Sequence, residues 1–109
     1  MKLVIAIVNH DDANLVTQFL AKAGFSSTKL PTTGGFLMAG NVTILIGVED
    51  EKVEQVISII HEHSHSRKQI IPASYPMGMQ GGFCSAPSIE VTVGGATVFV
   101  VDVERFERL

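Results

Sequence analysis

A strand–helix pattern that occurs twice is the feature that most constrains the fold of this chain. Each copy starts with a short run rich in β-branched residues, over residues 3–8 and 42–48, which is typical of a buried strand. Each run is followed by a segment whose apolar side chains share one helical face, over residues 15–23 and 53–60. We therefore expect two helices, each connected to a strand of the same sheet.

The ends of both predicted helices are marked by residues that start or stop helices. Asp11 or Asp12 can cap the first helix, and Asp50 can cap the second, because a short acidic side chain accepts hydrogen bonds from free backbone N–H groups. Gly24 can end the first helix. The second helix is expected to run out near residues 61–65.

The remaining strands complete one sheet. Residues 25–30 are expected to form a strand, and residues 89–93 and 96–103 to form two strands, or one strand broken at Gly94 and Gly95. The order predicts an α+β protein with the ferredoxin-like βαββαβ topology, an antiparallel sheet with both helices on one face. The other face would be apolar and uncovered in one chain, so pairing with other subunits is expected.

Two connections, residues 31–41 and 66–88, are long for a compact domain, and such connections are often functional. The first contains threonines and the pair Gly34-Gly35, which let a backbone approach a ligand and offer neutral hydrogen-bonding groups to phosphate. Closure of a β-hairpin by these glycines is the alternative. The second connection is rich in Pro and Gly and is expected to be mostly loop, with brief pairing near residues 69–71.

Composition limits the classes of function. A chain of 109 residues fits a single domain, residues 1–109, and its 46% hydrophobic content favours an oligomer. The formal net charge of −3 argues against nucleic-acid binding. No apolar run approaches the roughly 20 residues needed to cross a bilayer, so no membrane insertion is expected. Cys84 is a lone cysteine, which fits a reducing, cytoplasmic setting without an internal disulfide.

Catalytic residues are not evident. His10 followed by two aspartates could act as an oriented general base, but a capped strand-to-helix turn is the simpler interpretation. Cys84 lacks a nearby activating base. We therefore expect no enzyme activity, and a small enzyme that uses His10 stays an alternative.

A metal site is suggested by the alternation of His61, His63 and His65. If the helix continues, His61 and His65 lie at i and i+4 on one face, which suits a metal pair. A third ligand is missing, so a solvated helix end is the favoured interpretation. A metal-responsive trimer stays a further alternative.

Two sequence blocks, taken together, identify a resemblance. They read T-T-G-G-F-L-M-A-G-N over residues 32–41 and V-G-G-A-T-V-F-V over residues 93–100. Over essentially the whole chain, the sequence resembles the PstA/DarA family of PII-like cyclic di-AMP receptors. The resemblance implies a non-enzymatic, cytoplasmic homotrimer without a cofactor that binds cyclic di-AMP at subunit boundaries and signals to an unknown downstream protein. Residues 31–41 would be its T-loop and residues 66–88 its B-loop.

The resemblance also implies roles for individual residues. Thr28 would hydrogen-bond a phosphate, Asn41 would bind an adenine edge, and Gly47 would leave room for the ligand. Phe99 would line the pocket from the last strand. The other implied ligand-binding residues are Gly35, Phe36 and Leu37, which would contact one adenine and the nearby backbone, and Gly94.

Two positions depart from the family pattern. Ser26 stands where family members often carry arginine, and Met38 stands where the residue is often basic. Lys29 would point to the other face of the strand from Thr28 and cannot replace the arginine. Loss of one charged hydrogen bond, about 1.5–3 kcal/mol, would weaken binding roughly 10- to 150-fold. Binding of another adenine nucleotide, such as ATP, or loss of nucleotide binding is therefore the alternative.

Overall fold

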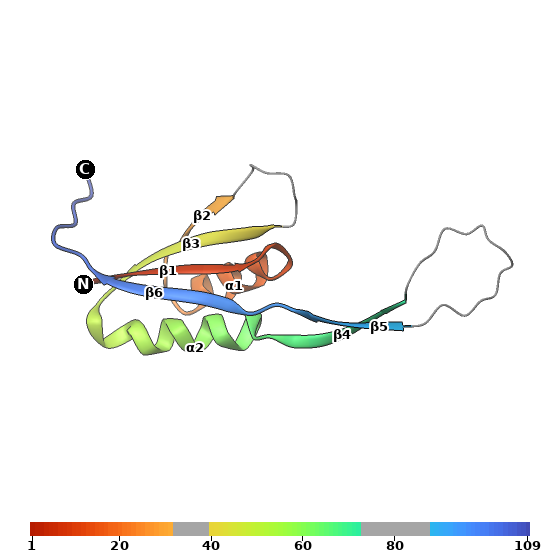
Figure 1. Cartoon of the computed structure of the whole chain (residues 1–109). Coiled ribbons are helices and arrows are strands. Elements are labelled where there is room, and N and C mark those ends of the chain that lie inside the picture. The colour runs from red at the N-terminus through yellow and green to blue at the C-terminus, as the bar shows by residue number, and fades with distance from the viewer. Residues whose placement is uncertain (32–39, 73–87) are drawn as a thin grey trace, which may run out of the picture.

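The body of the protein is a four-stranded antiparallel sheet with the strand order β2-β3-β1-β6 (Figure 1). The computed structural model describes residues 1–31, 40–72 and 88–109. Strand β1 (Lys2–Asn9) lies in the centre of the sheet and pairs antiparallel with both β3 (Asn41–Val48) and β6 (Ala96–Asp102). Strand β2 (Thr28–Pro31) pairs with β3 at one edge. This order confirms the predicted ferredoxin-like α+β fold.

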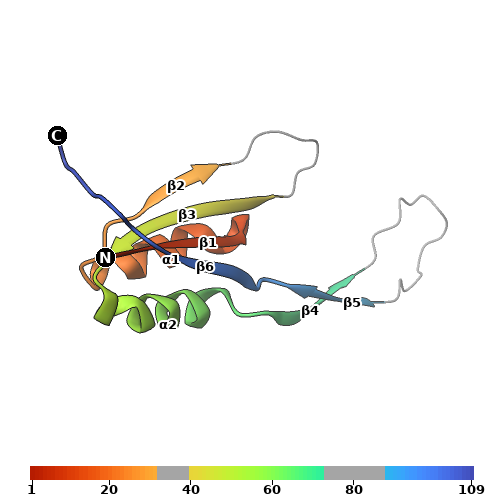
Figure 2. The same ribbon diagram turned by 60° about the vertical axis from the view of Figure 1, so that its left-hand side comes forward.

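Both helices, α1 (His10–Lys22) and α2 (Val53–Ser64), cover the same face of this sheet (Figure 2). Even-numbered residues from Val4 to Val8 in β1 and from Val42 to Val48 in β3 point toward the helices and are buried, because successive side chains of a strand alternate between its two faces. The strands contribute Val4, Ala6, Val8, Val42, Ile44, Ile46 and Val48 to the core, and the helices contribute Ala13, Val16, Leu20, Val56 and Ile60.

The first helix begins and ends through local hydrogen bonds. Asn9 is its N-cap, and the side chain of Asn9 accepts a hydrogen bond from the backbone N–H of Asp11 at 2.8 Å. The prediction that Asp11 or Asp12 caps this helix is therefore wrong; both lie in its first turn. At the other end, Gly24 has φ +93°, and the N–H of Phe25 donates to Leu20 O, which confirms Gly24 as the stop.

The second helix is preceded by a 3-10 turn, η1 (Asp50–Lys52). Asp50 lies within this turn, and neither η1 nor α2 has a side-chain cap, so the predicted Asp50 cap is wrong. The helical turn starts one residue too early for the Asp50 side chain to cap it. Among the described residues, no helix is long and apolar enough to span a membrane.

Strands β4 (Arg67–Pro72) and β5 (Ser88–Val93) form a second, two-stranded antiparallel sheet, which we call the arm. The arm projects beyond the end of α2, away from the body (Figures 1 and 2). The pairing predicted near residues 69–71 is confirmed, and it is longer than predicted, because β5 gives all six residues from 67 to 72 a partner. Gly94 and Gly95, with φ +82° and +93°, separate β5 from β6, so the predicted break divides two strands of different sheets.

Candidate ligand-binding site

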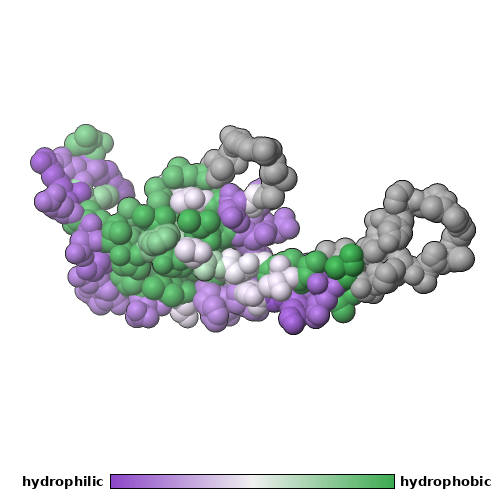
Figure 3. Space-filling view, viewed as in Figure 1, coloured by the Kyte–Doolittle hydropathy of each residue, from purple (hydrophilic) through white to green (hydrophobic). Residues whose placement is uncertain are grey.

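The sheet face opposite the helices, which we call the open face, is largely apolar, and neither described helix covers it. It carries the odd-numbered residues of β1, β3 and β6, because these pair directly with one another in the register. Figure 3 shows apolar side chains gathered over the body of the molecule. Leu30, Phe99 and Val101, which belong to this face, are 44%, 52% and 43% exposed.

Four of the residues predicted to bind ligand lie on the open face. Thr28 is paired with Leu45, and Phe99 is paired with Ile5, so both face away from the helices. Gly47 and Asn41 share this face because they are odd-numbered residues of β3. Lys29 points to the helix side, where its Nζ donates to Asn14 Oδ1 at 2.6 Å, in agreement with the expectation that it cannot replace an arginine beside Thr28.

A cavity of about 720 Å³ opens on this face and is lined by both Thr28 and Gly47. We call it the sheet cavity. Leu3 and Leu45 form part of its apolar floor. A Cβ atom added to Gly47 would meet no heavy atom within 4 Å, so the absence of a side chain there leaves space. Thr28 is exposed, and its hydroxyl makes no hydrogen bond with another described residue, so it is free to bind a ligand.

Residues 103–109 follow β6 and supply a second wall of the sheet cavity. The N–H of Val103 donates to Met1 O at 3.2 Å, which holds the start of this segment beside β1. Phe106, which is 58% exposed, and Arg108 both line the cavity. The C-terminal segment therefore places an aromatic ring and a guanidinium opposite Thr28.

The charge of the sheet cavity is net positive. Lys52 and Arg108 line it and form no ion pair within the described residues, whereas Glu49 is the acidic side chain in its lining. Ser26 also lines the cavity and is neutral. A ligand with negative charge and apolar rings matches these walls, since phosphate oxygens accept hydrogen bonds from hydroxyl, ammonium and guanidinium groups.

The other predicted ligand-binding residues are placed as follows. Asn41 and Phe99 lie on the open face but do not line the sheet cavity. Gly94 lies at the base of the arm, where an added Cβ would be 2.4 Å from Arg67 Nη1. Gly35, Phe36 and Leu37 lie outside the described residues, as does Met38.

The residues of the sheet cavity that sequence reasoning missed include two cations, Lys52 and Arg108, and one aromatic residue, Phe106. The available indication was weak: Phe106 is a large apolar residue in an otherwise charged segment, residues 104–108. Such a residue often packs against another part of the chain, but the local sequence does not identify that part.

The three alternating histidines do not form one cluster. His61 and His65 have ring centroids 6.0 Å apart, whereas the His63 ring stacks on Phe19 of α1 at 3.9 Å. Within the described ranges, no group of three or more His, Cys, Asp or Glu side chains is arranged to hold a metal ion. The third ligand that the sequence lacked is thus not supplied by another described element.

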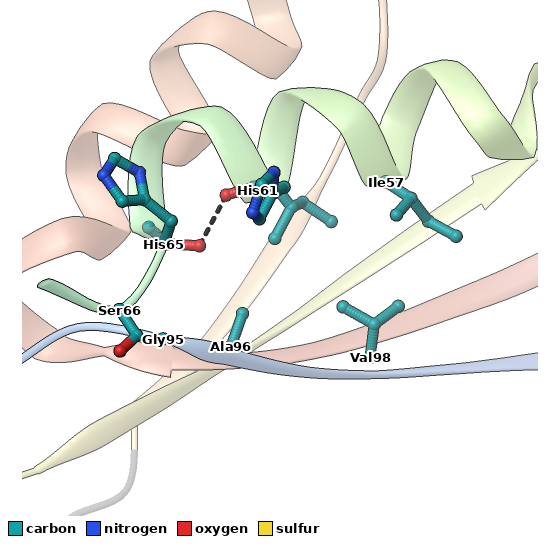
Figure 4. A pocket seen from close by; sticks show the side chains of 9 residues that line it. Ile57, His61, His65, Ser66, Gly95, Ala96 and Val98 are labelled. Atoms are coloured by element: carbon teal, nitrogen blue, oxygen red, sulfur yellow. Dashed lines mark hydrogen bonds between the residues drawn. The ribbon is translucent and has the colours of Figure 1, made fainter.

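His61 and His65 instead line a second cavity, of about 380 Å³, between α2 and β6. Ile57 of α2 and Val98 of β6 project toward each other across it (Figure 4). His10 is exposed and lies 3.7 Å from Asp11, measured from Nδ1 to Oδ1. Cys84 lies outside the described residues.

The fold, the open face and the sheet cavity define a small PII-like α+β protein with a cavity on its sheet. The model of the cyclic-di-AMP receptor family matches residues 1–109, so the chain belongs to this family. A solved structure, a functionally unknown protein from Pediococcus pentosaceus, is similar to the chain with 44% sequence identity and a TM-score of 0.78. The match covers 99% of this chain and 96% of that chain. The family resemblance inferred from the sequence is confirmed.

Proposed function

We propose that the protein is a non-enzymatic, cytoplasmic homotrimer that binds cyclic di-AMP at its subunit boundaries and signals through a change of loop conformation. Membership of the cyclic-di-AMP receptor family supports a cyclic di-AMP-binding signalling protein. The observation that carries the finer proposal is that the sheet cavity opens on the open face. A second subunit packed on that face closes the cavity and adds residues to it.

The walls of the sheet cavity match the chemistry of a cyclic dinucleotide. The two phosphates carry negative charge, and the Thr28 hydroxyl, Arg108 and Lys52 are the groups in the lining that can bind them. Adenine rings stack on aromatic or apolar side chains, and Phe106 and Leu45 offer such surfaces. Gly47 leaves the space in which a ring lies.

Assembly follows from the apolar character of the open face. Exposed large apolar side chains that form one patch are typical of a protein–protein contact. A trimer buries this patch and places one sheet cavity at each subunit boundary. Ligand binding then changes the conformation of the T-loop and the B-loop, which changes the surface offered to a downstream protein.

Binding of another adenine nucleotide is the second candidate, and the neutral Ser26 in the cavity lining is the observation that favours it. A ligand with a different phosphate arrangement, such as ATP, would place its phosphates near Arg108 and Lys52 and farther from Ser26. In this case the same cavity binds a nucleotide, but cyclic di-AMP is not preferred.

Calorimetric titration of the full chain with cyclic di-AMP, cyclic di-GMP and ATP tests the proposal, together with sedimentation velocity. We expect a trimer that binds one cyclic di-AMP per subunit and prefers it to the other two nucleotides. Tighter binding of ATP would favour the second candidate. An intact trimer with neither heat nor thermal shift at millimolar cyclic di-AMP would contradict ligand binding.

A further inference from the structure

An arginine at the base of the arm contacts the body of the protein. Arg67 is the first residue of β4, and its Nη2 donates to Asp12 Oδ1 of α1 at 2.8 Å. Its Nη1 lies 3.4 Å from Asp12 Oδ2 and donates to the carbonyl oxygen of His65 at 3.1 Å. The guanidinium thus binds α1 and the end of α2 at once, with the forked geometry that makes Arg–carboxylate pairs specific.

Asp12 is a buried carboxylate, and its side chain is 8% exposed. A buried charge is costly without a partner, and removing one member of such a pair leaves the other uncompensated. Within the described residues, Arg67 is the cation that pairs with Asp12. The body of the protein therefore favours the one arm position that keeps Arg67 beside Asp12.

The glycines at the junction of the arm and the sheet fit this arrangement. A Cβ at Gly94 would lie 2.4 Å from Arg67 Nη1 and 2.7 Å from His65 O, so a side chain there would displace the guanidinium. The N–H of Gly95 donates to Ser64 O at the end of α2. Two successive residues with positive φ interrupt the strand between β5 and β6, a conformation that glycine adopts readily.

The same turn of α1 also contacts the residue that precedes β3. His10 lies two residues before Asp12, and its N–H donates to Gly40 O at 3.1 Å. Asn9 fixes this turn by accepting from the Asp11 N–H. The first turn of α1 therefore has two attachments, one to the arm and one to Gly40.

We propose that the Asp12–Arg67 pair is a latch that fixes the arm against the body, with Gly94-Gly95 as its hinge. A two-stranded hairpin is at best marginally stable alone, so the order of the arm depends on the latch. Because the latch and the His10–Gly40 hydrogen bond share one helical turn, opening of the latch also loosens Gly40. The inference rests on contacts within one chain and does not depend on the identity of the ligand.

Hydrogen–deuterium exchange of the full-length protein tests the latch. In Arg67→Gln, we expect the amides of β4 and β5 and the His10 amide to exchange at least about tenfold faster, which corresponds to about 1.4 kcal/mol, while those of β1 are unchanged. Lys68→Gln is the matched control, because Lys68 is the next residue of the arm and forms only an exposed pair with Glu90, at 4.0 Å. Unchanged exchange in the arm of Arg67→Gln would overturn the proposal.

The double variant Asp12→Asn/Arg67→Gln distinguishes the proposed latch from an independent effect of Asp12 on α1. Asp12 also lies in the first turn of α1, where a negative charge favours the helix dipole. If the two residues act as one latch, arm exchange in the double variant is no faster than in Arg67→Gln alone. If their effects on arm exchange add, Asp12 acts independently and the latch is contradicted. The double variant leaves no unpaired buried charge, so it keeps the test decisive if Arg67→Gln does not fold.

Discussion

Thr28 of β2 and Gly47 of β3 lie on the same face of adjacent strands and line one cavity of about 720 Å³. Thr28 is opposite Leu45, and Gly47 is two residues farther along β3, so a hydroxyl lies beside a position without a side chain. The register of β2 against β3 brings these two residues together, although 18 residues separate them in the chain. A bound anion needs a hydrogen-bond donor beside open space, and these are the Thr28 hydroxyl and the space at Gly47.

Gly47→Val should abolish or strongly weaken nucleotide binding without loss of fold. A Cβ atom at this position would meet no heavy atom within 4 Å, the residue lines the sheet cavity, and β-branched residues are favoured in strands. We expect an affinity at least about tenfold lower and a melting temperature no lower than that of the wild type. Gly47→Ala should give a smaller loss. Wild-type affinity in Gly47→Val, measured by calorimetry, would place the ligand elsewhere.

Thr28→Val should weaken binding of cyclic di-AMP because it removes the hydroxyl and keeps the shape of the side chain. A hydrogen bond to a charged phosphate contributes about 1.5–3 kcal/mol, so the dissociation constant should rise roughly 10- to 150-fold. Thr43→Val is the matched control, since Thr43 lies on the same face of the sheet but does not line the cavity. Equal losses in the two variants would show that the effect is not a phosphate contact.

The fold could be predicted from the sequence largely because its core is encoded by local patterns. Residues 3–8 and 42–48 formed the expected strands, and the helical faces near Val16 and Ile60 are buried. The helix cap was missed because Asn9, Asp11 and Asp12 are all suitable N-cap residues. The choice among them depends on where β1 stops pairing, at Asn9 opposite Asn41.

Pairing near residues 69–71 and a strand over residues 89–93 could be predicted, but their pairing with each other and the C-terminal wall of the sheet cavity could not, because both depend on segments far apart in the chain. Residues 67–72 have little alternation of their own and become a strand only through pairing with β5. Arg108 reaches the cavity because β6 ends beside β1, which no local pattern of residues 104–108 shows. Family resemblance indicated Thr28 and Gly47, whereas tertiary structure was needed to find the cations opposite them.

Arg108→Gln should lower the affinity for a nucleotide and make binding less sensitive to salt. Arg108 lines the cavity where Ser26 provides no charge, so it is the guanidinium available to a phosphate there. We expect roughly a tenfold or greater loss at low ionic strength, and a smaller difference at high salt because screening weakens exposed charges. Arg105→Gln is the control, because Arg105 pairs with Glu107 and does not line the cavity. The same loss in both variants would argue for a general charge effect.

Leu20→Ala should destabilise the protein by about 2–5 kcal/mol, because a fully buried leucine leaves a cavity when it is truncated. Leu20 is 0% exposed and lies between α1 and the sheet. Leu15→Ala, on the same helix at 45% exposure, should change the free energy of unfolding by no more than about 0.5 kcal/mol. Urea unfolding at one fixed protein concentration measures the free energy of unfolding of both variants. A small effect of Leu20→Ala would mean that the helix is not packed as described.

Phe99→Lys should dissociate the proposed trimer. Phe99 is 52% exposed on the open face of β6, next to Ile5 of β1, and it lies among the apolar side chains that a second subunit would cover. A lysine at this position would bury a charge without a partner at the subunit contact, which costs several kcal/mol. Sedimentation velocity should then show monomers with unchanged far-ultraviolet circular dichroism. Leu15→Lys places the same charge at an exposed apolar position on α1, outside the open face, and should leave the assembly intact. An intact trimer in Phe99→Lys would show that subunits associate through a surface other than the open face.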